Sequence, residues 1–359
     1  MKASILRRFY RVNIKEDKIT ESQTKEHQLD PKTRELLEVS HVYNFYEDAT
    51  MGIFRKRERK QVLQDITLTI HRDEFFGLVG ESGCGKSTLG NAILNLIPYE
   101  GSIRLDGQEV SEMGRLQRTA KVQAVFQDPM SALNPRRTIG FTMEEPLRAH
   151  KIGTPEERKR LVNEMLDKIG LDASYASRYP KELSGGQRQR VCIGAALMLQ
   201  PDLVIADEAV SALDVSVGAQ ILNLFQSIDD QRDFSMLFIS HNMNVVYYLC
   251  DRIAVMYRGR IVELGTAEAV YHHPQHPYTK LLLSSVPDWN SRIEDDGTRS
   301  LEELEQEYED LEMQREDVPG ACCFYHRCPH AKEQCLQCPH AVNAADDGQE
   351  EHLVACCRV

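Results

Sequence analysis

Short apolar runs alternate with segments of helical spacing through the middle of this chain. The apolar runs end in glycine, a carboxylate or histidine, as expected of strands buried on both faces; they cover residues 74–80, 202–208 and 235–241. The segments between and around them repeat apolar residues three and four positions apart, which predicts helices at 87–97, 154–170 and 186–200. This alternation indicates an α/β core with a mainly parallel sheet.

Other strands carry a different pattern. Residues 36–46 and 61–70 alternate apolar and polar side chains, which is typical of half-buried strands. Residues 252–265 form two apolar runs around Arg258-Gly259, so they predict a hairpin that turns at this pair.

The pattern also divides the chain into regions. Residues 1–35 are polar and predict an N-terminal extension to a globular domain over 36–275. A C-terminal region, 276–359, begins with an apolar helical segment, continues with an acidic helical stretch at 300–316, and ends in a tail rich in cysteine and histidine. The chain contains no internal repeat.

Composition limits the partners. The 359 residues carry a formal net charge of −12, which disfavours nucleic-acid binding. No run approaches the roughly 20 apolar residues that span a bilayer, and the first residues are too polar for a secretory signal. We therefore expect a cytosolic protein, in which its 10 cysteines serve as thiols or metal ligands.

A glycine-rich segment follows the first buried run. Residues 80–88, GESGCGKST, fit the P-loop pattern G-x-x-x-x-G-K-[ST] between a strand and a helix. The glycines let consecutive backbone N–H groups point at phosphate oxygens, and the helix N-terminus favours the same negative charge. The spacing predicts that Lys86 contacts the β- and γ-phosphates of ATP and that Ser87 holds Mg²⁺. The residues expected to bind nucleotide are Gly80, Ser82, Gly83, Cys84, Gly85, Lys86, Ser87 and Thr88.

Cys84 lies inside this loop, beside Lys86 and the start of the helix. Both neighbours favour a thiolate, so we expect the pKa of Cys84 to be lowered. Alkylation of this thiol should then inhibit ATP hydrolysis, and bound ATP should protect it.

A second motif narrows the class of P-loop protein. The string LSGGQ at 183–187 places a hydroxyl and glycine N–H groups at a predicted helix start, with Arg188 and Arg190 beyond, as an anion-binding end requires. After a P-loop, it resembles the signature motif of ABC ATPases. The resemblance implies a P-loop NTPase core with an antiparallel β subdomain and a helical subdomain over about 138–200, and nucleotide contacts by Ser184, Gly185, Gly186 and Gln187.

Further segments match this family in its usual order. LVIADE at 203–208 resembles Walker B, in which Asp207 would bind Mg²⁺ and Glu208 would orient or deprotonate the attacking water. SALD at 211–214 resembles the D-loop. Gln127 resembles the Q-loop glutamine, which lies near the metal and the lytic water, and His241 resembles the switch histidine that contacts the γ-phosphate.

The aromatic side chain that stacks on adenine is expected near the end of the first strand. Tyr46 is our choice for it, and Tyr43 and Phe45 are alternatives.

Other segments resemble the oligopeptide/dipeptide branch of ABC importers; they are GESGCGKSTL, FQDPMSALNPR, HPYTKLLLSSVP and the ending PGACCFYHRCPHAKEQC…HLVAC. In that branch two ATPase subunits, often paralogues, drive two membrane permease subunits, and an extracytoplasmic binding protein delivers the solute. The resemblance therefore implies a peripheral protein on the cytoplasmic face of the membrane that powers solute import, with peptides as the expected solute. The alternatives are an importer ATPase for nickel or a metal chelate, and an ABC ATPase of translation or DNA repair, although such proteins usually carry two cassettes or a long coiled coil.

The family also implies a composite active site. The P-loop and the signature motif lie in different subdomains, so two chains would meet head to tail and each would lend Ser184 and Gly186 to the ATP of the other.

The cysteine-rich tail predicts a metal centre. Seven of the cysteines lie in the last 38 residues, and a small polar tail needs a cross-link or metal to fold. The family's ending matches Cys322, Cys328, Cys335 and Cys356, which indicates a [4Fe–4S] cluster. Zinc is the alternative, because Cys335-x2-Cys338 has zinc-like spacing and histidines lie close by.

Overall fold

The computed structural model describes most of the chain and divides it into two compact units. The residues described are 35–47, 59–211, 213–229, 234–284, 306, 308, 310–311, 318, 320–338, 343–345 and 352–356. The first unit is built mainly from 112–236 and the second from 37–70, 74–111 and 237–359.

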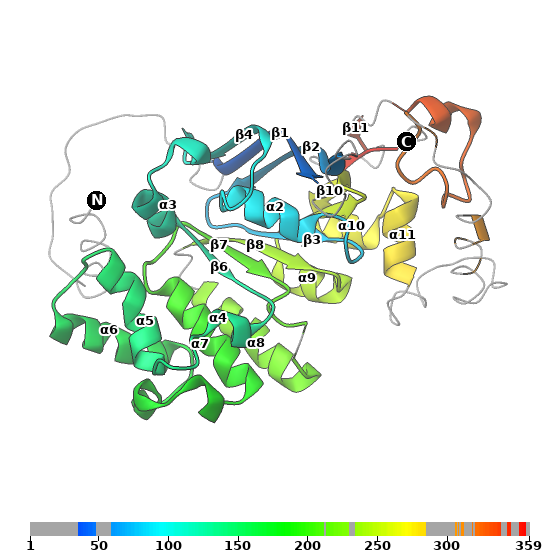
Figure 1. Ribbon diagram of the computed structural model, residues 1–359. Coiled ribbons are helices and arrows are strands. Elements are labelled where there is room, and N and C mark those ends of the chain that lie inside the picture. The colour runs from blue at the N-terminus through cyan, green and yellow to red at the C-terminus, as the bar shows by residue number, and fades with distance from the viewer. Residues whose placement is uncertain are drawn as a thin grey trace, which may run out of the picture. The chain divides into compact units, whose positions relative to one another are not determined.

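The first unit combines a short parallel sheet with helices (Figure 1). Its strands are β6 (Val122–Val125), β7 (Leu203–Asp207) and the first residues of β8 (Ser235–Ser240). Its helices are α3 (Arg115–Lys121), α4 (Pro129–Ala132), α5 (Ile139–Ala149), α6 (Pro155–Lys168), η3 (Ala173–Ser177), η4 (Pro180–Glu182), α7 (Gly185–Leu197) and α8 (Val215–Asp229). Strands β6 and β7 run parallel, and α7 packs beside β6 and against α4, α5, α6 and α8.

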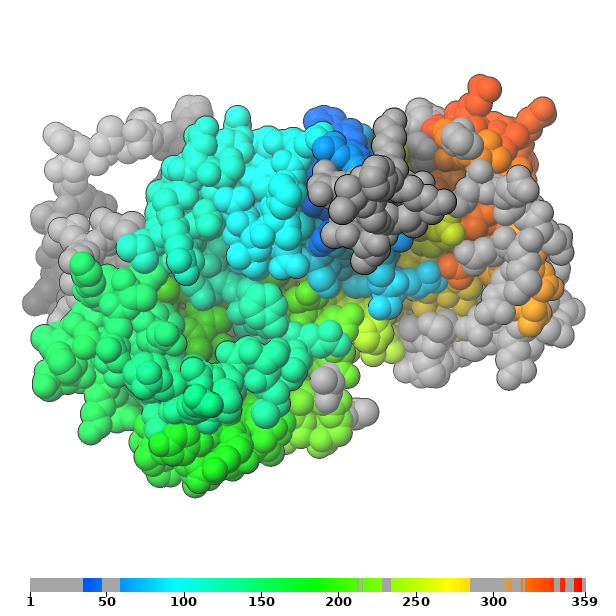
Figure 2. Space-filling model, viewed as in Figure 1, coloured from blue at the N-terminus to red at the C-terminus, as the bar shows by residue number. Residues whose placement is uncertain are grey.

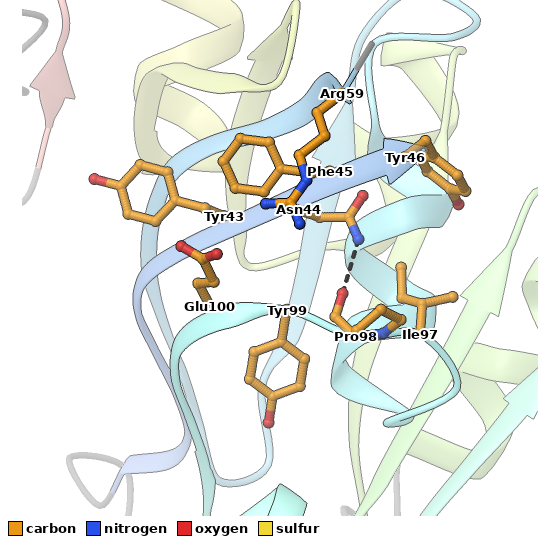
Figure 3. A pocket seen from close by; sticks show the side chains of 9 residues that line it. All are labelled: Tyr43, Asn44, Phe45, Tyr46, Arg59, Ile97, Pro98, Tyr99 and Glu100. Atoms are coloured by element: carbon orange, nitrogen blue, oxygen red, sulfur yellow. Dashed lines mark hydrogen bonds between the residues drawn. The ribbon is translucent and has the colours of Figure 1, made fainter. Parts of the chain in front are cut away.

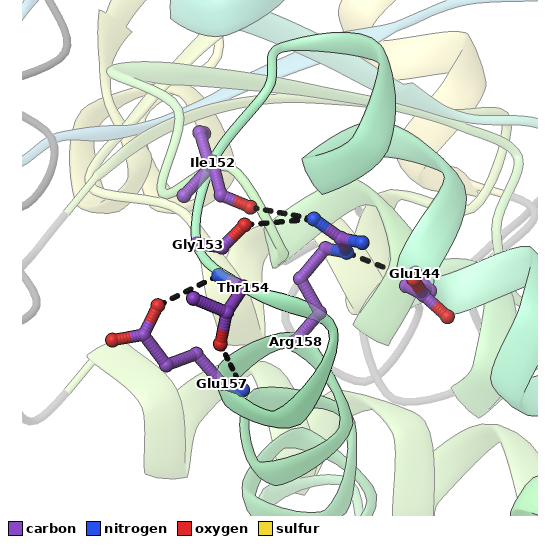
Figure 4. A network of polar contacts seen from close by, with 6 residues as sticks. All are labelled: Glu144, Ile152, Gly153, Thr154, Glu157 and Arg158. Atoms are coloured by element: carbon purple, nitrogen blue, oxygen red, sulfur yellow. Dashed lines mark hydrogen bonds and ion pairs between the residues drawn. The ribbon is translucent and has the colours of Figure 1, made fainter.

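A polar network fixes the connection between α5 and α6 (Figure 4). Thr154 caps α6 in a reciprocal capping box with Glu157, and Pro155 occupies the first turn, where its missing N–H costs nothing. Arg158 donates to the Glu144 carboxylate on α5 at 2.8 Å and to the Gly153 carbonyl at 2.7 Å. The start of α6 is therefore determined by local sequence and tied to its neighbour.

The second unit contains an antiparallel sheet with the order β2-β1-β4-β5. Its strands are β1 (Glu35–Glu47), β2 (Arg59–His71), β4 (Glu100–Leu105) and β5 (Gln108–Glu109). Leu37 faces Leu105 and Val39 faces Ile103 across β1 and β4, and all four side chains are buried. The alternation in residues 36–46 thus marks one buried face.

A second sheet in this unit has the order β11-β12-β10-β9-β3, with the later residues of β8 next to β3 (Figure 1). Its other strands are β3 (Phe75–Val79), β9 (Arg252–Tyr257), β10 (Arg260–Thr266), β11 (Asn343–Ala344) and β12 (Leu353–Val354). β3 and β9 are parallel, and β3 is buried along its whole length. The predicted hairpin is confirmed: β9 and β10 pair antiparallel around Arg258-Gly259, both at positive φ.

The helices of the second unit are η2 (Val110–Glu112), α2 (Lys86–Ile93), α9 (Met243–Leu249), α10 (Ala267–His272), α11 (Pro277–Ser284) and η5 (Glu333–Gln337). The prediction of a helix over 87–97 was wrong at its C-terminal end, because α2 stops at Ile93. Asn95, two residues beyond this end, takes a left-handed conformation with φ 53°, so the chain cannot continue as a right-handed helix.

Most of the acidic stretch 300–316 lies outside the described residues; its described positions, Gln306, Tyr308, Asp310 and Leu311, are helical. Within the described part of the chain, no helix combines the length and the apolar character that crossing a membrane requires.

Candidate nucleotide site

The P-loop joins β3 to α2 in the second unit. Gly80 lies so close to β9 that a Cβ atom there would come within 2.2 Å of the Met256 carbonyl oxygen. Gly85 caps α2 in a left-handed conformation with φ 113°, which costs an L-residue energy and glycine almost none. Ser82, Gly83 and Ser87 are exposed. The loop therefore has the curled backbone and the accessible hydroxyl that the sequence predicts for a phosphate and Mg²⁺ site.

Lys86 is 5% exposed and its ammonium group is directed into the loop. Its Nζ donates to the carbonyl oxygens of Gly80 at 2.7 Å and Glu81 at 2.8 Å. These charge-assisted bonds hold the cation at the centre of the loop, where an incoming phosphate would replace or share them.

The expectation for Cys84 was wrong. The pKa of its thiol is raised because the side chain is buried at 7% exposure. Lys86 opposes the shift, with its Nζ 3.8 Å from Sγ, but desolvation is the larger effect. Sequence proximity to a cation therefore did not determine the state of this thiol.

In the first unit, the Walker B glutamate meets the Q-loop glutamine. The Gln127 amide donates to the Glu208 carboxylate at 3.1 Å and contacts the Ser211 hydroxyl at 3.4 Å. Ser211 Oγ in turn donates to the Glu208 carbonyl at 2.9 Å. Glu208 has φ 48°, a strained conformation for a non-glycine residue that costs about 1–3 kcal/mol and is concentrated at functional sites. Asp207 precedes it as the last residue of β7.

His241 follows β8 in the second unit, with its side chain exposed, and Asn242 caps α9 directly after it. The predicted site residues are thus distributed over both units: the P-loop and His241 in the second, and Gln127, Asp207 and Glu208 in the first.

The LSGGQ string begins α7. Ser184 is the N-cap, with its hydroxyl accepting from Gln187 N–H at 3.3 Å while the Gln187 side chain accepts from Ser184 N–H at 2.9 Å. Ser184 and Gly185 are exposed, whereas Gly186 is buried so tightly that a Cβ would lie 2.2 Å from Val217 on α8. The helix start is preorganised and its first residues are accessible.

The two arginines that follow are held away from this helix start. Arg188 donates to the Pro180 carbonyl at 2.8 Å, and Arg190 donates to the Gln220 side chain at 2.7 Å. These arginines link α7 to η4 and α8 by hydrogen bonds, a role that the sequence pattern alone does not indicate.

Tyr46 borders a pocket of about 390 Å³ at the ends of β1 and β4 (Figure 3). Tyr46 is 47% exposed, and both alternatives, Tyr43 and Phe45, also line this pocket. The pocket is rich in aromatic side chains, and its lining also includes Tyr99 and Arg59. It does not distinguish among the three candidates for adenine stacking.

The cysteine-rich tail brings the predicted ligands into one neighbourhood. The pKa of Cys328 is raised to about 11, mainly by burial, and Cys322, Cys335 and Cys356 are close enough to add to the shift. The Cys322 N–H donates to the Cys335 carbonyl at 2.7 Å. Among the described residues, however, no group of three or more His, Cys, Asp or Glu side chains is arranged to hold a metal ion.

Sequence reasoning missed two residues, Tyr278 and Arg327, that bind the P-loop residue Glu81. Glu81 receives a hydrogen bond from Arg327 and donates its N–H to Tyr278, and both partners belong to the C-terminal region. No local pattern signals such pairs, because 246 and 197 positions separate them.

Comparisons with known proteins identify the family of the chain. Residues 63–211 match the family described as "ABC transporter", and residues 262–335 match "Oligopeptide/dipeptide transporter, C-terminal region". The chain is 42% identical over 312 residues to the oligopeptide transport ATP-binding protein AppF of Bacillus subtilis, covering 85% of this chain and 92% of that protein. It is 40% identical over 316 residues to the dipeptide transport ATP-binding protein DppF of Haemophilus influenzae, covering 87% and 93%.

Solved structures show the same architecture. The ATP-binding cassette MJ0796, in a dimeric post-hydrolysis state bound to ADP and Pi, superposes with a TM-score of 0.57 at 29% identity, over 65% of this chain and 99% of that one. The cbiO1 protein of Clostridium perfringens, from the ABC transporter complex cbiONQ, gives a TM-score of 0.59 at 24% identity, over 72% and 96%, and supports the fold alone.

Proposed function

This chain belongs to the ATP-binding subunits of ABC transporters, in the oligopeptide/dipeptide family, and on that premise we propose that it hydrolyses ATP to power the import of peptides through a membrane permease. The observation that carries the chemical part is the Gln127–Glu208 contact at 3.1 Å beside a strained backbone, in a chain that also has a complete P-loop. The relatives described above are named for oligopeptides or dipeptides, which favours peptides over nickel or a metal chelate as the solute.

The P-loop binds the triphosphate. Backbone N–H groups of 82–88 surround the phosphates, and Lys86 exchanges its carbonyl partners for β- and γ-phosphate oxygens. The exposed Ser87 hydroxyl and the Asp207 carboxylate, with Gln127, suit the oxygen coordination of Mg²⁺. When bound, Mg²⁺ neutralises charge on the phosphates.

Hydrolysis depends on the side chains after β7 and β8. Glu208 orients or deprotonates the attacking water, and Gln127 holds the carboxylate through the 3.1 Å contact. His241 contacts the γ-phosphate and stabilises the charge that develops there. Tyr46 stacks on adenine, with Tyr43 and Phe45 as alternatives on the same pocket.

Two ATPase subunits form the complete site. Ser184, Gly185, Gly186 and Gln187 form a preorganised helix start, with Ser184 and Gly185 exposed, that can receive the γ-phosphate of a second subunit. The partner is a paralogue or a second copy. Further partners are two permease subunits and an extracytoplasmic solute-binding protein, so the chain would work at the cytoplasmic face of the membrane as a peripheral subunit.

The tail is proposed to hold a [4Fe–4S] cluster, with zinc as the alternative. Support comes from the chemistry of the donors: thiols are the ligands of such clusters, and Cys322, Cys335 and Cys356 each contribute to the raised pKa of Cys328. The cluster would cross-link the tail rather than take part in hydrolysis.

Two variants test the assigned roles. Lys86→Ala should weaken MgATP binding at least about 10-fold, because it removes a charge-assisted contact with phosphate. His241→Ala should leave the Kd for MgATP within about 2-fold and lower kcat by about 10²-fold, since it removes a contact made mainly in the transition state. Equal losses of affinity in both variants, measured by titration calorimetry and steady-state ATPase assays, would contradict these roles.

A further inference from the structure

The second residue of the P-loop is held from three directions. The Glu81 N–H donates to the Tyr278 hydroxyl at 2.8 Å, and its carbonyl oxygen accepts from Lys86 Nζ at 2.8 Å. Its carboxylate accepts from Arg327, whose Nη1 lies 3.0 Å from both oxygens. Tyr278 is the second residue of α11 and Arg327 precedes Cys328 in the tail, so two separate segments of the C-terminal region bind one P-loop residue.

An aromatic cluster anchors these two segments. Phe324, 1% exposed, has its ring centroid 5.2 Å from that of Tyr257 on β9 and 5.5 Å from that of Tyr278. Tyr278 is itself fully buried. The residues coloured orange to red, 320–338, form part of the surface of this unit in Figure 2, while Phe324 is buried inward. The tail is therefore fixed on the strand that supports the P-loop, and Arg327 is placed by it.

The charges make this link specific. The Arg327 side chain is 15% exposed and Glu81 is 42% exposed, so the cation is partly desolvated. Neutralising Glu81 would deprive Arg327 of this carboxylate, and losing Arg327 would free Glu81 to rotate. Since Glu81 precedes the N–H groups that face phosphate, its orientation decides how well the empty loop matches the ligand.

We propose that Arg327 and Tyr278 are positioning residues for ATP, through which the C-terminal cysteine region holds the P-loop in its nucleotide-binding form. The inference rests on the proposed ATPase function. It follows that any change of the tail that displaces Arg327, such as loss of a cross-link at the adjacent Cys328, lowers the affinity for ATP. A structural change in the tail would then alter ATP binding at the P-loop, although the tail makes no contact with the nucleotide.

The test measures the Kd for MgATP of the full-length chain by titration calorimetry. Arg327→Gln should raise the Kd about 3- to 10-fold with little change in kcat at saturating ATP. Arg327→Lys should restore most of the affinity, because only one nitrogen of Arg327 contacts the carboxylate. Tyr278→Phe should also raise the Kd, since it leaves the Glu81 N–H without its acceptor.

A double-mutant cycle separates positioning from general damage. Glu81→Gln combined with Arg327→Gln should weaken binding no more than either change alone, because both remove one interaction. Arg160→Gln, which breaks an exposed ion pair with Glu164 on α6, is the matched control and should keep the wild-type Kd. Thermal midpoints of all variants identify any that are unfolded.

The possible results are distinct. The positioning role would be overturned if folded Arg327→Gln bound MgATP with the wild-type Kd. It would also be overturned if the effects of Glu81→Gln and Arg327→Gln on the Kd were additive. If, in that case, Lys86→Ala still weakens MgATP binding at least about 10-fold, the proposed ATPase function stands while this inference fails. If the wild-type chain does not bind MgATP, the proposed function itself fails.

Discussion

Glu208 is the residue whose geometry is most informative. A glutamate at φ 48° is unfavourable in isolation, and here the Ser211 hydroxyl and the Gln127 amide fix its carbonyl and carboxylate. The sequence predicted the carboxylate and its role from the resemblance to Walker B. It predicted neither the positive φ nor the contact that holds the carboxylate, because Gln127 is 81 positions away in the sequence.

Cys84 provides a prediction at the same scale. Burial raises the pKa of this thiol, so it is protonated at neutral pH and protected from solvent. We expect its alkylation at pH 7.5 to be at least about 10-fold slower than that of free cysteine, to accelerate as pH rises, and to slow further with MgATP bound. Peptide mass spectrometry after timed alkylation measures this rate separately from the other cysteines.

Alkylation of Cys84 should also affect function, because the tight P-loop has no room for the added alkyl group. Modification of Cys84 should inhibit ATP hydrolysis, and Cys84→Ser should make activity resistant to the same reagent. Reaction at Cys84 faster than free cysteine would contradict the buried thiol, and modification without inhibition would contradict its place against the phosphates.

At the scale of elements, a buried polar network joins β10, β12 and the start of α11. The Glu263 carboxylate, 0% exposed, accepts from the N–H groups of Gln275 at 2.7 Å and His276 at 2.9 Å, and lies 2.8 Å from His352 Nε2. His276 Nδ1 accepts from the Tyr278 N–H at 3.1 Å. Such complete pairing is what allows a carboxylate to be buried.

This network predicts a loss of stability in mild acid. Burial lowers the pKa of His276 from 6.5 to about 4, although Glu263 opposes the shift. The unfolded chain therefore takes up the proton first, so this contribution is complete above about pH 6.5 and is lost as pH falls toward 4. Between pH 7 and pH 5 it should cost about 2 kcal/mol of unfolding free energy.

Urea unfolding at the two pH values measures that loss. His276→Asn keeps a hydrogen-bond acceptor but has no titrating side chain. Its unfolding free energy should therefore fall by about 2 kcal/mol less than that of the wild type between pH 7 and pH 5. The exposed His273→Asn is the control and should behave like the wild type. An unchanged pH dependence in His276→Asn would show that His276 is not the titrating group.

Elements were predicted well where the pattern is local. The buried strands and the hairpin at Arg258-Gly259 follow from apolar runs and a turn pair, and the capping box at Thr154 explains why α6 starts where it does. The end of α2 was missed, because apolar periodicity continues to Ile97 while the left-handed conformation of Asn95 has already ended the helix. The link from Tyr278 and Arg327 to Glu81 was missed because it joins elements far apart in sequence.

At the scale of the whole molecule, we predict that a metal centre cross-links the cysteine-rich tail. Chain purified without oxygen should be brown and absorb near about 400 nm, as thiolate-bound iron does. Cys328→Ser should remove the colour, because Cys328 is one of the four proposed ligands and the other three thiols raise its pKa. Colourless protein with stoichiometric zinc would decide for zinc, and metal-free protein with titratable tail thiols would rule out both.

The central claim is that ATP hydrolysis by this chain drives peptide import, and the most direct measurement is ATPase activity in the assembled transporter. The complex of this subunit with its ATPase partner, permeases and peptide-loaded binding protein should hydrolyse ATP severalfold faster than the same complex with empty binding protein. Glu208→Gln in this chain should lower that stimulated rate at least about 10²-fold while MgATP still binds, because the variant removes the group that activates water. The account would be contradicted if the ATPase rate were the same with peptide-loaded and empty binding protein, or if Glu208→Gln left the rate unchanged.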